Sequence, residues 1–231
     1  MKAIILAAGR GSRMGILTAE KPKCLTILNG KPLIEHQISA LTQAGLKEIG
    51  IVTGYMAECL TQYDLKKIYN PLWQNTNMVH SLLCAQEWLE TDDCIVSYSD
   101  IFYGSKIINE LIKCKENISI AYDPNWLELW SKRFENPLDD AEAFRIDNNG
   151  CLLEIGQKPK SIEEIQGQYM GLLKFKKEFW EKVDFFIPPQ MDMTSFLSKI
   201  IKKNIKVQTV SNYRKWGEID NKEDLKIYSN I

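Results

Sequence analysis

The stretch Lys2-Ala-Ile-Ile-Leu6, followed by Ala7-Ala-Gly-Arg-Gly-Ser-Arg-Met-Gly15, decides the fold of this chain. Its first part is a short apolar run without polar alternation, which indicates a strand buried on both faces of a parallel sheet. The run passes directly into a loop rich in glycine and arginine. Open α/β sheets bind their ligands at the carboxyl ends of the strands. The stretch therefore predicts a parallel sheet whose first strand ends at a ligand site.

Short apolar runs alternate with amphipathic segments as far as Tyr122. Such alternation predicts an α/β fold, a doubly wound and mostly parallel sheet with helices on both faces. We expect strands over 25–28, 49–53, 94–98 and 118–122, and helices over 33–44, 77–90 and 105–114.

The pattern changes after Asp123. A helix is expected over 126–130, and the turn residues Asn148-Asn-Gly150 predict a β-hairpin between 143 and 155. Strands over 169–175 and 205–210 and a helix over 193–203 then return to the sheet. We interpret residues 1–231 as a single domain, with residues 123–170 as a small β-hairpin and helix insert at its edge.

Charge and cysteine content narrow the partners. The 29 basic residues nearly balance the 30 acidic residues, and the formal net charge of −1 gives no electrostatic reason to bind nucleic acid or an anionic membrane. The six cysteines show no metal-ligand spacing, so free thiols are expected. No apolar run reaches the roughly 18 residues that a membrane helix requires. We expect a cytoplasmic protein whose partners are small molecules or proteins.

The loop after the first strand matches neither of two well-known phosphate-binding motifs. Both the dinucleotide fingerprint and the P-loop would require glycine where Met14 stands. A glycine-rich turn can still surround phosphate oxygens with backbone N–H groups, and Arg13 and Lys23 add positive charge nearby. The alternative is an ordinary turn with solvated basic residues.

The segments Leu6-Ala-Ala-Gly-Arg-Gly-Ser-Arg-Met14 and Lys21-Pro-Lys-Cys-Leu25 resemble the two-part signature of the nucleotidyltransferase family. This signature is shared by sugar-1-phosphate nucleotidylyltransferases and by cytidylyltransferases that activate phosphocholine and related phosphoesters. The resemblance continues at 53–55, 77–82, 97–100 and 218–220. It implies a Rossmann-like nucleotidyltransferase fold and an enzyme that joins a phosphate monoester to the α-phosphorus of a nucleoside triphosphate, releasing pyrophosphate.

The resemblance also implies catalytic residues. Lys23 is expected to contact the α-phosphate and the incoming phosphate, and Arg13 the β- and γ-phosphates. Holding the reactants in line and neutralising charge are the main contributions to such a displacement. Asp100 and Asp220 are expected to bind Mg²⁺, which prefers carboxylate and phosphate oxygens. The alternative role for each aspartate is that of a helix cap.

Two sets of binding residues follow from the same resemblance. Asn77 has the alternative role of a helix cap, and the tryptophans after Asp123 could simply pack the insert onto the sheet. The expected nucleotide-binding residues are Leu6, Ala8, Gly9, Gly11, Ser12, Arg13, Lys23, Asn77 and Ser81. The expected acceptor-binding residues are Trp126, Trp130, Arg133, Arg145, Tyr169 and Gly171.

The composition of the insert leaves the acceptor open between two chemistries. Aromatic and acidic side chains together suit a quaternary ammonium such as choline. Arginine paired with an acid would suit a zwitterionic amino acid, because the guanidinium group binds a carboxylate in a bidentate way. The stretch from Trp126 to Arg145 looks closer to a capsule-associated subgroup that includes CTP:phosphoglutamine cytidylyltransferases.

The leading hypothesis is a Mg²⁺-dependent cytidylyltransferase, monomeric or homodimeric, that joins CTP to a small phosphorylated amine or amino acid. The resemblance associates its CDP-linked product with decoration of capsule or other cell-surface polysaccharide. One alternative is a sugar-1-phosphate nucleotidylyltransferase that uses UTP or dTTP. The other is a non-catalytic, nucleotide-binding regulatory protein.

Overall fold

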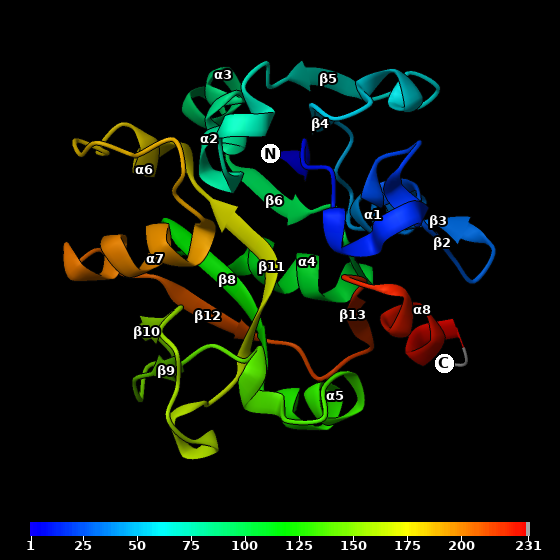
Figure 1. Ribbon diagram of the computed structural model, residues 1–231. Coiled ribbons are helices and arrows are strands. Elements are labelled where there is room, and N and C mark those ends of the chain that lie inside the picture. The colour runs from blue at the N-terminus through cyan, green and yellow to red at the C-terminus, as the bar shows by residue number, and fades with distance from the viewer. Residues whose placement is uncertain (230–231) are drawn as a thin grey trace.

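A seven-stranded sheet forms the centre of the protein, in the strand order β12-β8-β11-β6-β1-β4-β5 (Figure 1). The computed structural model describes residues 1–229. Six strands run parallel and β11 runs antiparallel between β6 and β8, so the predicted mostly parallel α/β sheet is confirmed. The strands are β1 (Lys2–Ala7), β4 (Ile49–Thr53), β5 (Lys66–Tyr69), β6 (Cys94–Tyr98), β8 (Ile118–Asp123), β11 (Gln168–Phe175) and β12 (Gln208–Ser211).

Helices cover both faces of this sheet (Figure 1). Helices α1 and α4 contact each other on one face, whereas α2 contacts α3 and α7, and α3 contacts α6, on the other. Among the described residues, no helix combines the length and the apolar character needed to cross a membrane. The helices are α1 (Leu33–Gln43), α2 (Met78–Leu83), α3 (Gln86–Thr91), α4 (Ser105–Lys113), α5 (Trp126–Arg133), α6 (Lys177–Trp180), α7 (Met193–Lys202) and α8 (Lys222–Ser229).

The single helix predicted over 77–90 is wrong, because the segment forms the two short helices α2 and α3. The break falls at Cys84 and Ala85. In α3, after the break, the ring of Trp88 packs over Gly50 of β4. A Cβ atom at position 50 would lie 2.9 Å from this ring. Packing against the sheet therefore overrides the continuous helical pattern of the sequence.

Strand β11 departs from the expected strand-and-helix alternation. Before it, the chain forms the predicted antiparallel hairpin of β9 (Phe144–Ile146) and β10 (Leu152–Ile155). The chain then returns to the sheet without a crossover helix, and β11 consequently runs opposite to its neighbours. Its register with β8 shifts between Tyr169 and Leu173, where Gly171 has a φ of +73°.

Two short ribbons and two 3-10 helices complete the sheet edge that faces the ligand site. Strand β7 (Ile101–Tyr103) pairs with β13 (Trp216–Glu218), and β2 (Ile27–Leu28) pairs with β3 (Lys31–Pro32). The 3-10 helices η1 (Ser12–Thr18) and η2 (Lys23–Leu25) lie in the loop after β1.

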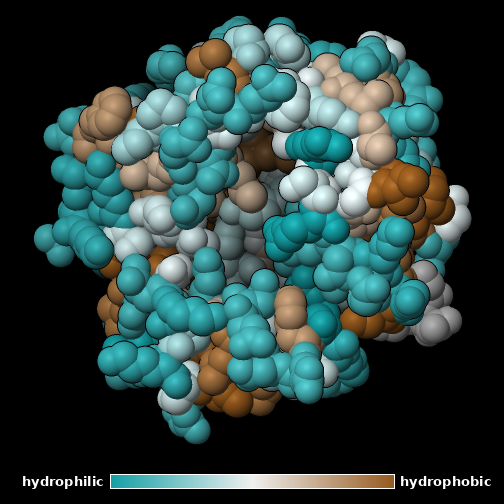
Figure 2. All heavy atoms as spheres, in the orientation of Figure 1, coloured by the Kyte–Doolittle hydropathy of each residue, from teal (hydrophilic) through white to brown (hydrophobic). Residues whose placement is uncertain are grey.

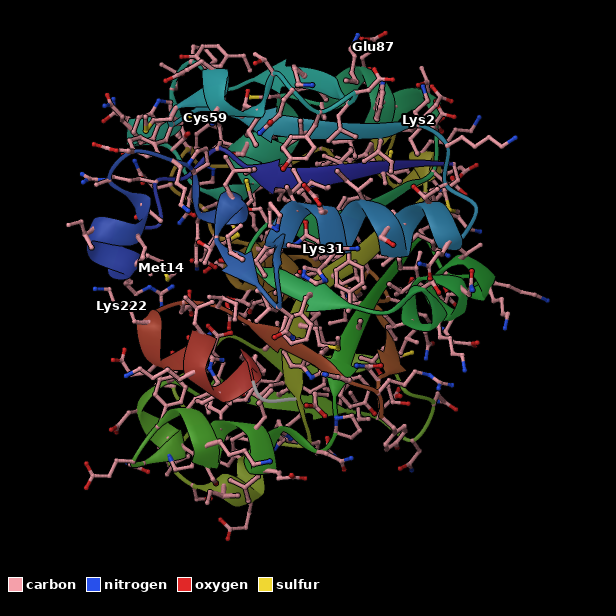
Figure 3. All side chains as sticks on the ribbon, turned by 90° about the vertical axis from the view of Figure 1, so that its right-hand side faces the viewer. Lys2, Met14, Lys31, Cys59, Glu87 and Lys222 are labelled. Carbon is pink, nitrogen blue, oxygen red and sulfur yellow. The ribbon has the colours of Figure 1, made fainter. Side chains whose placement is uncertain are left out.

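A second, smaller hydrophobic core joins the two ends of the chain. In Figure 3, η1 with Met14 lies beside the start of α8, where Lys222 is labelled. Arg13 and Asp220 are direct chain neighbours of two members of this core, so the core holds both at one edge of the sheet. Its members are Met14, Leu28, Leu33, Phe102, Ile219 and Tyr228.

The bulge in β11 provides a test of this packing. In Gly171→Ala, the left-handed φ would be strained and the new Cβ would lie 2.7 Å from the ring of Tyr98. We expect the free energy of unfolding to fall by about 3 kcal/mol in urea titrations. The matched control is Gly45→Ala, which has a φ of +88°, but no described residue other than its chain neighbours lies within 4 Å of the new Cβ. This control should lose only about 1 kcal/mol, and equal losses in the two variants would contradict the close approach to Tyr98.

Candidate active site

A buried lysine lies at the centre of the site. The Nζ atom of Lys23 is 2.7 Å from Oδ2 of Asp100 and 2.6 Å from Oδ1 of Asp220. Arg13 approaches from the solvent side, with a guanidinium nitrogen 3.1 Å from the same Asp220 oxygen. The structure thus brings together the four residues that the sequence singled out as catalytic, and their catalytic roles stay predictions.

The charges in this group depend strongly on one another. Burial alone would lower the pKa of Lys23, but Asp100 and Asp220 outweigh it and raise that pKa above its ordinary value. Burial would raise the pKa of Asp220, but the hydrogen-bonded ammonium group of Lys23 lowers it. Lys23 is therefore held as an ammonium group between carboxylates.

Local backbone structure explains how Lys23 reaches this position. Its aliphatic stem lies against Gly11, where a Cβ atom would be only 2.8 Å from Cβ of Lys23. Gly11 also has a φ of +68°, a conformation that glycine adopts without strain. On the opposite side, the Ile219 N–H donates to the carbonyl of Asp100 at 2.9 Å. This bond ties the loops that carry the two aspartates.

A third acid, Glu218, belongs to the same group. One carboxylate oxygen from each of Glu218, Asp100 and Asp220 lies within 4.8 Å of the others. Burial, together with the charges of Asp220 and Asp100, raises the pKa of Glu218 to about 8. Glu218 was not among the expected site residues, although its spacing from Asp220 in an extended segment places both side chains on one side.

These acids fit a divalent cation. The Oδ1 atom of Asp100 is buried and has no hydrogen-bond partner among the described residues. Hard cations such as Mg²⁺ are bound through one or two carboxylates plus phosphate oxygens. Neither aspartate takes the alternative role of a helix cap. At the start of α8 the Asp224 N–H donates to the side chain of Asn221 rather than of Asp220, and the cap position of α4, the helix that follows Asp100, is occupied by Gly104.

Arg133 is placed differently from the expectation that it binds the acceptor. Its side chain is fully buried, and its guanidinium nitrogens lie 3.2 Å from Glu218, 3.5 Å from Asp220 and 2.9 Å from Asp224. These three acids use the hydrogen-bonding capacity of the guanidinium group. Arg133 therefore positions the acid cluster from the insert side.

A cavity of about 220 Å³, here called the nucleotide cavity, opens beside this group. Of the expected nucleotide-binding residues, all but Ser12 line it, and Ser12 is exposed at the start of η1. Several other residues that line it were not among those expected. These are Trp73, Thr76, Met78, Tyr98 and Ser99.

Asn77 has the helix-capping role that was the alternative, and it also lines the nucleotide cavity. Its side-chain oxygen accepts a hydrogen bond from the Met78 N–H at 2.8 Å at the start of α2. Ser81, one turn further along α2, accepts a hydrogen bond from Asn70 at 3.1 Å. The two predicted residues thus lie on the first turns of one short helix.

A second cavity of about 310 Å³, here called the acceptor cavity, adjoins the first. Arg13, Met78 and Tyr98 line both cavities. Figure 2 shows the face of the molecule hollowed near its centre, with mostly hydrophilic residues around the hollow. The two cavities meet where the lysine, arginine and acids converge.

The structure brings only part of the expected acceptor-binding set to this cavity. Trp130, Tyr169 and Gly171 line it. Trp126 is buried, and its indole N–H donates to the carbonyl of Ile165 at 3.3 Å. It therefore has the alternative role given above, that of packing the insert. Arg145 lies exposed on β9 and pairs with Glu154 at 3.7 Å.

A backbone connection links the walls of the two cavities. The Asn77 N–H donates to the carbonyl of Pro189 at 2.8 Å, and the Val79 N–H donates to that of Met191 at 3.4 Å. The start of α2 lines the nucleotide cavity, whereas Asp192 and the start of α7 line the acceptor cavity. Both cavities therefore share one hydrogen-bonded wall.

Comparisons with known proteins agree with this geometry. The model of the MobA-like NTP transferase domain matches residues 3–144, and the chain belongs to this family of nucleotidyltransferases. It is 39% identical to CTP:phosphoglutamine cytidylyltransferase of Campylobacter jejuni, over 98% of each chain. It is 25% identical to choline-phosphate cytidylyltransferase of Streptococcus pneumoniae, over 95% of this chain and 98% of that protein.

A solved structure shares the fold. The inositol-1-phosphate CTP transferase from T. maritima superposes with a TM-score of 0.79 over 98% of this chain and 93% of that chain, at 18% identity. The Rossmann-like nucleotidyltransferase fold that the sequence predicts is thus confirmed.

The buried arginine gives a test of how the site is held. In Arg133→Met, Glu218 and Asp224 would lose their buried partner, and we expect the free energy of unfolding to fall by about 3–5 kcal/mol in urea titrations. Arg145→Met removes an exposed pair and should change stability by less than about 1 kcal/mol. Near-equal effects would show that Arg133 does not hold the acid cluster.

Proposed function

We propose that this protein is a cytidylyltransferase that joins the CMP moiety of CTP to the phosphate of a small phosphorylated amine or amino acid. Pyrophosphate is the second product. The observation that carries the proposal is the convergence of Lys23, Arg13 and the two aspartates where the nucleotide and acceptor cavities meet. The cytidylyltransferase relative aligned along 98% of both chains supports CTP as the donor.

The positions of Lys23 and Arg13 suit transfer between two phosphates. Lys23 lies between the cavities and can neutralise charge on the α-phosphate and on the incoming phosphate. The Arg13 side chain is 69% exposed and can move to the departing β- and γ-phosphates. No general base is needed, because the attacking phosphate is already an anion. Catalysis then consists of alignment and charge neutralisation.

We propose Mg²⁺ as the metal, held by Asp100 and Asp220 with Glu218 beside them. When bound, it would neutralise phosphate charge and leave Lys23 free of its carboxylate partners. The orphaned Oδ1 atom of Asp100 and the raised pKa of Glu218 support a cation at this place. The cytoplasmic location, the monomeric or dimeric state and the use of the product on cell-surface polysaccharide stay predictions.

The nucleotide preference separates this proposal from a sugar-1-phosphate nucleotidylyltransferase. In a thermal-shift panel with Mg²⁺, CTP should raise the melting temperature more than UTP, dTTP or ATP at equal concentration, because ligand binding to the folded state stabilises it. A larger shift with UTP or dTTP than with CTP would favour the sugar-nucleotide enzyme.

The role of Lys23 can be tested by pyrophosphate release. Removing one charge-stabilising donor costs about 10²–10³-fold in turnover in other enzymes, and we expect a loss of at least this size in Lys23→Ala. Lys31→Ala, at an exposed position on β3, should keep full activity.

A second variant covers the case in which Lys23→Ala unfolds because two acids lose their partner. Arg13→Ala removes an exposed side chain, so it should retain the native circular dichroism spectrum and still lose turnover. Near-normal rates in both variants would refute the assigned chemistry. So would the finding that the unmodified protein releases no pyrophosphate with any acceptor tested. The latter result would favour a nucleotide-binding regulatory protein.

A further inference from the structure

The acceptor cavity is lined by five acids and a single basic residue, Arg13, among the described residues. Two of the acids already have cationic partners, since Glu218 contacts Arg133 and Asp220 contacts Lys23. The other three have no lysine or arginine nitrogen within 4 Å in the part of the chain that the structure describes. We call these three the acceptor-side acids. They are Asp140, Glu142 and Asp192.

The acceptor-side acids differ in the hydrogen bonds that their carboxylates accept from the protein. Asp192 caps α7 by accepting from the Ser195 N–H at 2.7 Å, and Asp140 accepts from the indole N–H of Trp130 at 3.1 Å. Among the described residues, the Glu142 carboxylate accepts only a long bond of 3.4 Å, from Thr194. Glu142 is thus the acid with the most unused hydrogen-bonding capacity.

The electrostatic surroundings of Glu142 point the same way. Burial, followed by the charges of Asp192 and Asp140, raises the pKa of Glu142. Its carboxylate therefore lies in a partly desolvated place, and residues 1–229 supply no lysine or arginine nitrogen within 4 Å to compensate its charge. A positively charged ligand group would relieve this cost, whereas a negatively charged group would add to it.

Aromatic rings form much of the remaining wall. Tyr98 and Tyr169 meet edge to face with ring centres 5.8 Å apart, and the ring centres of Trp130 and Trp216 are 6.3 Å apart. All four residues line the cavity. Aromatic faces attract cations, so these walls and the acids favour the same ligand charge.

The arginines that might have bound an acceptor carboxylate are engaged elsewhere. Arg133 is buried among three acids, and Arg145 is exposed on β9. Arg13 lies beside Asp220, at the end where the phosphates react. A ligand carboxylate near Glu142 would therefore find no arginine among the residues that the structure describes.

We infer that the acceptor carries a cationic nitrogen that binds to Glu142, with Asp140 and Asp192 adding to the attraction. This inference rests on the proposed function, because it assumes that the second cavity receives the phosphorylated acceptor. The composition of the insert left open whether the protein recognises an ammonium group or a carboxylate of the acceptor, and this inference selects the ammonium group. The ammonium group is the recognised feature of the acceptor, and any carboxylate group contributes nothing to binding.

A pair of isosteric probes tests this inference by calorimetry, with Mg²⁺ and a non-hydrolysable CTP analogue present. Phosphocholine carries the positive charge, and 3,3-dimethylbutyl phosphate has the same shape without it. We expect the charged probe to bind at least about tenfold more tightly, the range of a hydrogen bond or contact to a charged group. Equal dissociation constants would overturn the inference.

Variants test whether the preference for the charged probe comes from Glu142. The ratio compared is the dissociation constant of the uncharged probe divided by that of phosphocholine. Glu142→Gln should reduce this ratio severalfold while leaving the affinity for the CTP analogue unchanged. Asp192→Asn keeps a good helix cap and should reduce the ratio to a smaller extent. Glu154→Gln, on the nearby strand β10 but outside the cavity, should keep the full ratio. An unchanged ratio in Glu142→Gln would contradict the assignment.

Modified phosphorylated amino acids separate the two charged groups. N-acetylation of glutamine phosphate should weaken binding at least about tenfold, whereas converting its carboxylate to an amide should not. The opposite result would show carboxylate recognition and overturn the inference. Formation of a CDP-linked product is measured separately, so a protein that binds the cationic probes but makes no product would refute only the proposed function.

Discussion

The ion pair that Lys23 shares with Asp100 and Asp220 is the interaction on which the site depends. It joins residues that are 77 and 197 positions apart in the chain. A buried ammonium group is costly unless it is paired, and each buried carboxylate is costly for the same reason. The three charges therefore stabilise one another only in this arrangement, which holds the loop after β1, the end of β6 and the segment after β13 together.

Two further devices hold the same arrangement. The small core around Met14 and Ile219 fixes the chain neighbours of Arg13 and Asp220. Arg133 reaches from the insert to Glu218 and Asp224 and so couples the insert to the acid cluster. The insert thus both forms a wall of the acceptor cavity and supports the proposed metal site.

The sequence predicted the parts that local patterns determine. The apolar run from Lys2, the loop that follows it and the hairpin turn near Gly150 each contain their own structural signal. The antiparallel direction of β11 and the ribbon of β7 and β13 depend on long-range pairing, which no local pattern encodes. Likewise, the burial of Arg133 could not be inferred from its neighbours, because its partners lie some 90 residues later.

We propose that Lys23 exchanges its carboxylate partners for the α-phosphate of CTP when the nucleotide binds. A crystal structure of the protein with Mg²⁺ and a non-hydrolysable CTP analogue measures this directly. We expect the Lys23 ammonium to lie within hydrogen-bonding distance of an α-phosphate oxygen, with Asp100 and Asp220 holding the metal. A nucleotide bound in the same cavity with its phosphates directed away from Lys23, and Lys23 still paired to both aspartates, would contradict it.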